Sequence, residues 1–253
     1  LSMYDWAKFR RTKGAVKLHL VLDHDGYLPS FAVITDGLCH DVKVAYALKF
    51  DPGTIVVDDR GYNDYHLFAK WTEEEVSFVT RQKGNATYTV IESREGYIHP
   101  VLRDEIILLT GPGAAEKCPF PIRRIEFYNA EKEQIMVFLT NNMSLDAQTV
   151  ADVYKDRWQI ELFFKALKQN LKIKTFVGTT ANAVKIQIWT ALVAMLILRY
   201  CQLKASFLWS LSNLVALLRM NLFTHRDLWR WLDEPYETPP IPYAQEQMVL
   251  ALG

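Results

Sequence analysis

The chain has 253 residues, of which 50% are hydrophobic and 23% are charged, so it can bury a core and is neither disordered nor a low-complexity repeat. Its 29 Lys and Arg residues balance 29 Asp and Glu residues, which argues against a protein whose whole surface binds nucleic acid. The three cysteines are far apart and lack C-x-x-C spacing, which excludes a disulfide framework and a zinc ribbon and favours a reducing compartment.

A β-hairpin followed by a short helix is predicted at the start of the chain. Residues 13–23 alternate between apolar and polar side chains, as in a half-buried strand. Asp25-Gly26 supplies a hairpin turn, and residues 28–35 form the return strand. The apolar positions within 41–50 then predict a helix.

The next segment places two acids at the end of a buried strand. Residues 54–58 are β-branched and show no alternation, which predicts a central strand buried on both faces. Asp58 and Asp59 therefore lie at the carboxyl end of this strand, where open α/β sheets bind ligands. Adjacent strand residues point to opposite faces, so only one of the two can face a shared ligand. Asp64 is expected to cap the following helix.

The rest of the chain is first β-rich and then helical. Five short β-rich runs separated by Gly, Pro and Asn fill residues 76–141. One long helix is predicted from Ser144, as its N-cap, to about Leu171. Further helices are predicted at 181–202 and 207–222, followed by an irregular tail from residue 233. The apolar run at 188–198 is too short to span a bilayer, which predicts a buried helix.

Charge is concentrated on the long predicted helix. Between Tyr154 and Lys174 the chain carries six basic and two acidic residues. At helical spacing one stripe about 80° wide holds Tyr154, Arg157, Glu161, Lys165 and Lys168. One reading is a solvated face whose i,i+4 ion pairs contribute only tenths of a kcal/mol. The other is that Glu161 binds a divalent cation while the Arg and Lys side chains hold phosphate oxygens.

The spacing of this stripe resembles a known signature. Tyr154, Arg157, Glu161 and Lys168 reproduce the pattern Y-(2)-R-(3)-E-(6)-K, which resembles the YREK signature of DDE transposases of the insertion-sequence family numbered four. The segment from Asp59 to Tyr62 is similar to the region around that family's second catalytic aspartate, and the β-rich stretch occupies the place of the family's β insertion. The resemblance covers nearly the whole chain.

The resemblance implies a fold and a domain organisation. The expected fold class is α/β, with a ribonuclease H-like mixed sheet and flanking helices, interrupted by a β-rich insertion before the helix that carries the catalytic Glu. The first part of the core would occupy residues 1–79 and the insertion residues 80–141. The second part of the core, with the C-terminal helices, would occupy 142–232, and an irregular tail 233–253.

The resemblance also implies a metal-dependent reaction on DNA. Such enzymes cut DNA at the ends of a mobile element and join the 3′-hydroxyl to target DNA, using carboxylates that hold two Mg²⁺ or Mn²⁺ ions. Asp59 and Glu161 match the second and third acids, and Asp59 is preferred to Asp58 because it directly precedes Arg60-Gly61. Only Asp5 precedes the hairpin, without a strand leading into it. We therefore expect the first aspartate upstream of this chain and the fragment itself to be inactive.

DNA is the expected partner. The predicted phosphate contacts are Tyr154, Arg157, Lys165 and Lys168 on the long helix, and Arg10 and Arg11 in a basic cluster near the start of the chain. Arg123 and Arg124 in the β insertion are weaker candidates for contact near an unpaired base. The protein is expected to act as a homodimer in a synaptic complex and not at a membrane. Its expected location is the prokaryotic cytoplasm, at the nucleoid. The alternatives are an inactive DNA-binding or assembly module and a ribonuclease H-like nuclease.

Overall fold

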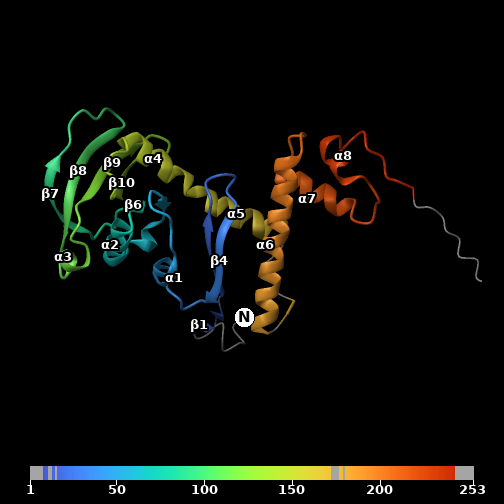
Figure 1. Cartoon of the computed structure of the whole chain (residues 1–253), viewed down its shortest axis with the longest axis horizontal. Helices are drawn as coiled ribbons and strands as arrows, with labels where there is room; N and C mark the ends of the chain where they lie inside the picture. The colour runs from blue at the N-terminus through green and yellow to red at the C-terminus, as the bar shows by residue number, and fades with distance from the viewer. Residues whose placement is uncertain (1–7, 11–12, 15, 172–176, 179, 243–253) are drawn as a thin grey trace, which may run out of the picture. The chain divides into compact units, whose positions relative to one another are not determined.

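The computed structural model describes all residues except 1–7, 11–12, 15, 172–176, 179 and 243–253 (Figure 1). The chain divides into two compact units. The first comprises residues 1–21 and 31–161, and the second comprises residues 22–30 and 162–253. The two units are described separately below.

The first unit is built on a mixed sheet of six strands, in the order β5-β6-β10-β9-β8-β7. The strands are β5 (Ile55–Val57), β6 (Ser77–Arg81), β7 (Thr87–Ser93), β8 (Val101–Thr110), β9 (Ile122–Asn129) and β10 (Gln134–Thr140). β5 is parallel to β6, and every other neighbouring pair is antiparallel. The strands β7 to β10 can be followed side by side in Figure 1. The expected mixed α/β class with flanking helices is confirmed.

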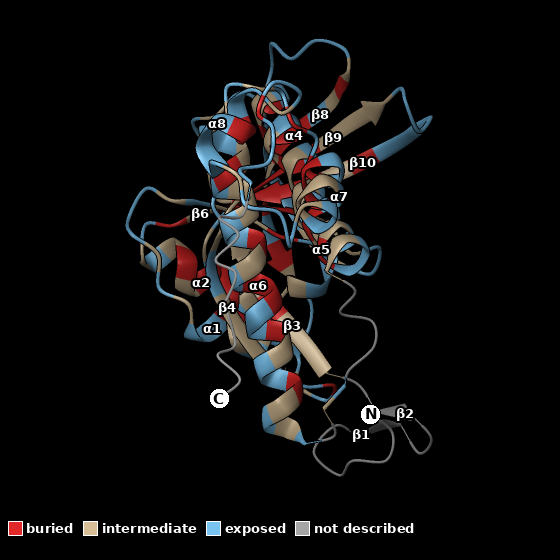
Figure 2. Ribbon diagram, turned by 90° about the vertical axis from the view of Figure 1, so that its right-hand side faces the viewer, coloured by how far each residue is buried: buried red, intermediate tan, exposed pale blue. Residues whose placement is uncertain are grey.

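One face of this sheet is covered by α2 (Tyr65–Glu73) together with the short α3 (Ala114–Lys117). Phe68 and Trp71 of α2 are almost completely buried, and the ring of Phe68 stacks on that of Phe78 with 4.3 Å between centroids. The buried side of α2 is red in Figure 2. As predicted, Asp64 caps α2, because its carboxylate accepts a hydrogen bond from the Leu67 amide at 3.1 Å.

The other face of the sheet is covered by α4 (Ala147–Asp156). Phe78 and Val79 are adjacent in β6 and point to opposite faces, so Val79 packs against Val150 of α4 in a separate cluster. The prediction of one helix from Ser144 is wrong in two respects. Asp146 rather than Ser144 caps α4, and the helix gives way at Arg157 to α5 (Trp158–Asn170). Tighter hydrogen bonds that span three residues replace the regular ladder there.

The N-terminal part forms two small separate sheets. β1 (Lys8–Arg10) pairs with β2 (Lys13–Gly14), and β3 (Val16–Leu22) pairs with β4 (Pro29–Asp36). The predicted strand at 13–23 is seen as β2 and β3, and Ala15 between them lies outside the described residues. The turn at Asp25-Gly26 is confirmed, with Gly26 at a φ of 77°. The predicted helix follows as α1 (Asp41–Ala47), shorter than expected.

The second unit contains α6 (Ala181–Lys204), α7 (Leu211–Met220) and α8 (Leu228–Asp233). Its core gathers around Trp209, which packs on Trp231 and donates its indole N–H to the Leu232 carbonyl at 2.7 Å. Among the described residues α6 is the one helix long and apolar enough to cross a membrane by length and composition. The prediction of a buried helix is right for one face only, because Trp189 and Ile197 are exposed.

Candidate active site

The loop after β5 fixes the side chain of Asp59. Asp59 caps the short 3₁₀ turn Arg60–Tyr62, and its Oδ1 accepts a hydrogen bond from the Gly61 amide at 2.6 Å. A Cβ atom on Gly61 would lie only 2.8 Å from that oxygen, so this position needs glycine for the close approach. Asp59 is exposed, and within the described part of the chain its Oδ2 accepts no hydrogen bond.

Asp58 lies in a very different environment from its neighbour. Its side chain is buried, and neither carboxylate oxygen has a hydrogen-bond partner among the described residues. Burial raises the pKa of Asp58 to about 8, and the adjacent negative charge of Asp59 adds to the rise. Asp58 therefore holds its proton at neutral pH. The alternation of strand side chains predicts that only one of the two acids faces a ligand, but it does not predict that Asp58 is buried with a raised pKa.

The loop that carries both acids is fastened to β6 through Asn63. Thr80 in β6 donates its hydroxyl to Asn63 Oδ1 at 2.9 Å. Asn63 Nδ2 donates to the Arg81 carbonyl at 2.9 Å, and Lys83 Nζ donates to the Asn63 carbonyl at 3.0 Å. These hydrogen bonds hold the acid loop against the end of β6, so the two acids have a rigid base. None of these partners was singled out by the sequence pattern.

At the junction of α4 and α5, Arg157 joins Glu161 to the core. Its Nη2 donates to Glu161 Oε1 at 2.8 Å, and Glu161 keeps 42% of its side chain exposed. The ring of Tyr154 is buried against Phe138, with 5.0 Å between centroids, and lies 5.6 Å from the Arg157 guanidinium carbon. Tyr154 therefore supports Arg157 from the core side, and only its edge reaches the surface.

The acid loop and the helix junction share one electrostatic neighbourhood. Burial is the main cause of the raised pKa of Tyr154, and the negative charge of Asp59 contributes to it. The positive charge of Arg157 acts in the opposite direction to burial on the pKa of Asp58. The structure thus brings the two acids after β5 together with Tyr154 and Arg157, and Arg157 carries Glu161.

The remaining expected DNA contacts belong to other parts of the chain. Lys165 and Lys168 are exposed on the portion of α5 that belongs to the second unit. Arg10 ends β1, but its side chain is not among those described, and Arg11 and Asp5 lie outside the described residues. These four positions stay predictions.

The structure favours a core position for Arg123 and Arg124 over the weaker alternative of contact near an unpaired base. Arg123 is buried and makes a two-fold hydrogen bond to Asp104, with distances of 2.8 and 2.6 Å. Arg124 is also buried and pairs with Glu105 at 2.9 Å and Glu126 at 2.6 Å. Buried charges are stable only when they are paired, and both guanidinium groups are used in these pairs. Neither guanidinium is therefore available to a ligand.

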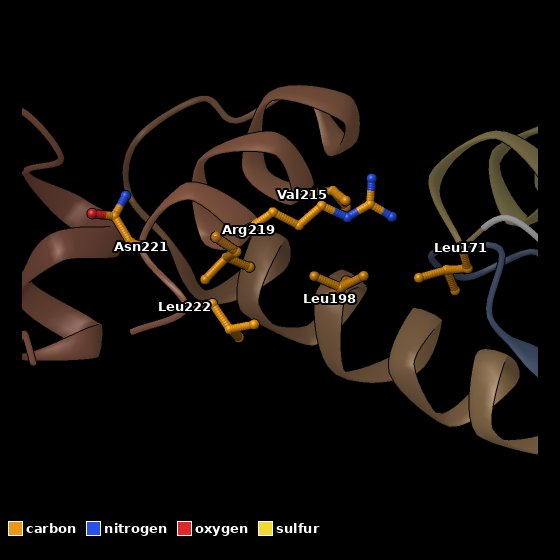
Figure 3. A pocket seen from close by; sticks show the side chains of 7 residues that line it. Leu171, Leu198, Val215, Arg219, Asn221 and Leu222 are labelled. Atoms are coloured by element: carbon orange, nitrogen blue, oxygen red, sulfur yellow. The ribbon is translucent and has the colours of Figure 1, made fainter. Parts of the chain in front are cut away.

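Among the described residues, no three His, Cys, Asp or Glu side chains gather closely enough to hold a metal ion. A cavity of about 400 Å³ in the second unit does not supply such a group either. Figure 3 shows its lining, which is apolar apart from Arg219 and Asn221. Arg219 is occupied, since it donates to the Asn170 carbonyl. The acid chemistry therefore belongs to the end of β5 and the α4–α5 junction.

Comparisons with known proteins point in one direction. The sequence model of the family described as "Transposase DDE domain" matches residues 4–197. A protein of Sinorhizobium fredii named as a transposase, y4zB, is 32% identical over 228 residues, which are 88% of this chain and 64% of that protein. A protein of Geobacillus stearothermophilus named as a transposase for insertion sequence element IS5377 is 32% identical over 199 residues, covering 77% of this chain and 52% of that protein.

A third relative extends the comparison. A Synechocystis protein named as a transposase for insertion sequence element IS4SA is 27% identical over 183 residues, which are 68% of this chain and 49% of that protein. The chain thus spans between about half and two thirds of the length of the curated relatives that it matches.

Proposed function

Because the chain belongs to the family of transposase DDE domains, we propose that it is catalytic-domain sequence of a DNA transposase that cuts DNA at element ends and transfers the 3′-hydroxyl to target DNA. The proposal is supported by the charge interactions that link Asp58 to Arg157 and Asp59 to Tyr154, together with the hydrogen bond from Arg157 to Glu161. We further propose that Tyr154, Arg157, Glu161 and Lys168 form the YREK signature of the insertion-sequence family numbered four, which the spacing supports.

The acids fit divalent metal ions. Mg²⁺ and Mn²⁺ take oxygen ligands, and carboxylates supply them without further chemistry. Asp59 offers an oxygen that no described residue uses, and Glu161 remains partly exposed beside its partner Arg157. We propose that Asp59 and Glu161 hold two such ions. When bound, the ions would lower the pKa of an attacking water or orient a 3′-hydroxyl and would neutralise charge on the entering and leaving oxygens.

The chain's own residues would position the reacting groups. The Gly61 amide keeps the Asp59 carboxylate turned outward, and Arg157 holds Glu161 in one orientation. Arg157 can also hold a phosphate oxygen, because a guanidinium has five N–H donors and Glu161 uses one of them. Tyr154 would offer DNA at most the edge of its ring while it supports Arg157. Lys165, Lys168, Arg10 and Arg11 would contact the phosphate backbone.

The chain would work with DNA ends and target DNA in the bacterial cytoplasm at the nucleoid, as a homodimer in a synaptic complex. An inactive DNA-binding or assembly module is the second candidate. Such a module would use the same Arg and Lys side chains to hold phosphates without metal ions.

Metal binding tests the proposal. Isothermal titration calorimetry with Mn²⁺ should show binding to the parent that is weakened at least tenfold in Asp59→Asn and in Glu161→Gln, since each variant loses an anionic oxygen ligand. Glu131→Gln is the matched control, because Glu131 is an exposed acid of the same unit paired only with Lys155. Equal Mn²⁺ affinity in the parent and in Glu161→Gln would contradict the assignment.

DNA assays separate the two candidate functions. Because the first aspartate is expected upstream of these residues, an enzyme should nick supercoiled plasmid with Mn²⁺ when the chain is extended upstream, and the extended protein should lose that activity in Asp59→Asn. An assembly module should bind DNA equally well with Mn²⁺ and with EDTA and should leave the plasmid intact.

A further inference from the structure

We infer that Arg81 and Arg60 form an additional phosphate site, which holds a backbone phosphodiester of DNA beside Asp59. The inference deepens the proposed function and rests on it. It adds two residues that lie outside the YREK pattern and that come from β6 and from the turn after β5.

The fold places the Arg81 guanidinium at the candidate active site. Arg81 is the last residue of β6 and pairs in register with Phe138 of β10. The Phe138 ring packs on Tyr154, which in turn lies under Arg157. The Arg81 carbonyl accepts the side-chain amide of Asn63, so the end of β6 and the acid loop are joined at this residue.

The Arg81 side chain is half-buried, and among the described residues it has no hydrogen-bond acceptor. Within the described part of the chain, no carboxylate lies within ion-pair distance of either Arg81 or Arg60. Burial lowers the pKa of Arg81, and the positive charges of Arg60 and Arg157 lower it further. A structural arginine in this sheet looks different, since Arg123 is buried and fully paired with Asp104. Arg60 and Arg157 thus add positive charge around Arg81, and no described carboxylate pairs with Arg81 to offset the repulsion.

Arg157 adds an independent sign of a missing acceptor. Its Nε is buried and has no hydrogen-bond partner among the described residues, although its Nη2 is bound to Glu161. Arg199 and Arg226 also have a buried Nε without a described partner, but of these three arginines it is Arg157 whose charge acts on Arg81, where a ligand could supply the acceptor.

The chemistry of the cluster selects a phosphodiester. Guanidinium groups bind phosphate with two parallel hydrogen bonds, and such contacts position a strand without reading its sequence. A phosphodiester carries the single negative charge and the two free oxygens that Arg81 and Arg60 can share. Its place beside Asp59 would set the DNA strand against the acids.

The test is the salt dependence of DNA binding in EDTA, which removes any contribution from metals. Fluorescence anisotropy of a labelled 20-base-pair duplex gives the dissociation constant of the full chain between 50 and 200 mM NaCl. Loss of one phosphate contact should lower the slope of log affinity against log salt by about 0.9. The advantage of the parent over Arg81→Gln should therefore shrink about 3.5-fold across this range. Arg60→Gln should behave in the same way.

The control is Arg103→Gln, which removes the same charge from an exposed arginine that pairs with Glu126 at 3.6 Å. It should keep the parent slope. Without DNA, Arg81→Gln should melt at the parent temperature or above it, because repulsion is relieved. A lower melting temperature for Arg81→Gln, or parental slopes for both Arg81→Gln and Arg60→Gln, overturns the inference and leaves the proposed function standing. A parent chain that binds no DNA overturns both, while loss of Mn²⁺ binding with normal slopes affects the proposed function alone.

Discussion

The buried acid Asp58 makes the stability of the chain depend on pH, and Asp58→Asn tests this. The pKa of Asp58 is about 8 in the folded chain against 3.8 as its ordinary value, because burial of the carboxyl group outweighs the nearby Thr80 hydroxyl and the positive charge of Arg157. Between these two values the unfolded chain has lost the proton and the folded chain keeps it. Protonated Asp58 therefore makes its full contribution to the free energy of unfolding below about pH 4, and this contribution is lost as the pH rises through 8.

The size of the effect follows from the shift. Each pKa unit corresponds to about 1.4 kcal/mol, so the free energy of unfolding should fall by about that amount per pH unit between roughly pH 4 and pH 8. The whole shift corresponds to about 6 kcal/mol, an upper figure because water entry at the loop would reduce it. Asparagine cannot titrate, so Asp58→Asn should remove this slope whatever its own effect on stability.

Urea unfolding at pH 5, 6, 7 and 8, in EDTA to exclude metal ions, gives the slope for each protein. The parent curve should be steeper than that of Asp58→Asn by about 1 kcal/mol per pH unit. Asp51→Asn is the matched control for the loss of one acid, because Asp51 lies at the surface of the same unit. Parallel slopes for the parent and Asp58→Asn would refute the reasoning that burial keeps this group protonated.

Three further changes test separate features. Arg123→Met leaves the carboxylate of Asp104 buried without its partner and should lower the free energy of unfolding by about 3–5 kcal/mol. The double variant with Asp104→Leu should recover most of this loss, because it removes the unpaired charge as well. A double variant as unstable as Arg123→Met would count against a paired buried charge. Gly61→Ala forces the Asp59 carboxylate aside and should weaken Mn²⁺ binding about tenfold at nearly unchanged melting temperature, whereas parental affinity would show that the contact is dispensable. Asp146→Ala removes the cap of α4 at a loss of about 1 kcal/mol near pH 7. Because the cap's hydrogen bonds lower the pKa of Asp146, the difference in unfolding free energy between the parent and Asp146→Ala should become smaller as the pH falls below the ordinary pKa of an aspartate. A difference that does not change with pH would argue against the cap.

Local patterns predicted the parts of the fold that depend on local chemistry. The β-branched run at 54–58 formed a strand, β5, but the prediction of a central strand buried on both faces is wrong, because β5 is the edge strand among the described strands of the sheet and Ile55 is exposed. Asp64 caps α2, because a capping carboxylate bonds to an amide only three residues ahead. The long helix failed at Arg157, where periodicity gives no sign of the tighter hydrogen bonds that separate α4 from α5.

The residues of the candidate site could be predicted only where their intervals along the sequence match a known pattern. The spacing singled out Arg157 and Glu161, which the structure joins by a hydrogen bond. The buried state of Asp58 and the position of Arg81 depend on β6, more than twenty residues further along the chain, so no local pattern contains them. The burial of Arg123 likewise depends on its partner Asp104 in the neighbouring strand β8.

The pairing of β10 with β6 has a mechanical consequence. The β-rich segment does not hang from the core by two flexible connections, because its last strand continues the same sheet that carries the acid loop. Force or deformation applied to the far strands β7 and β8 is transmitted through backbone hydrogen bonds to the strand that ends at Arg81. Excising the segment would leave β6 with an unpaired edge, so its tips are the places where the chain can accept length changes or fusion partners.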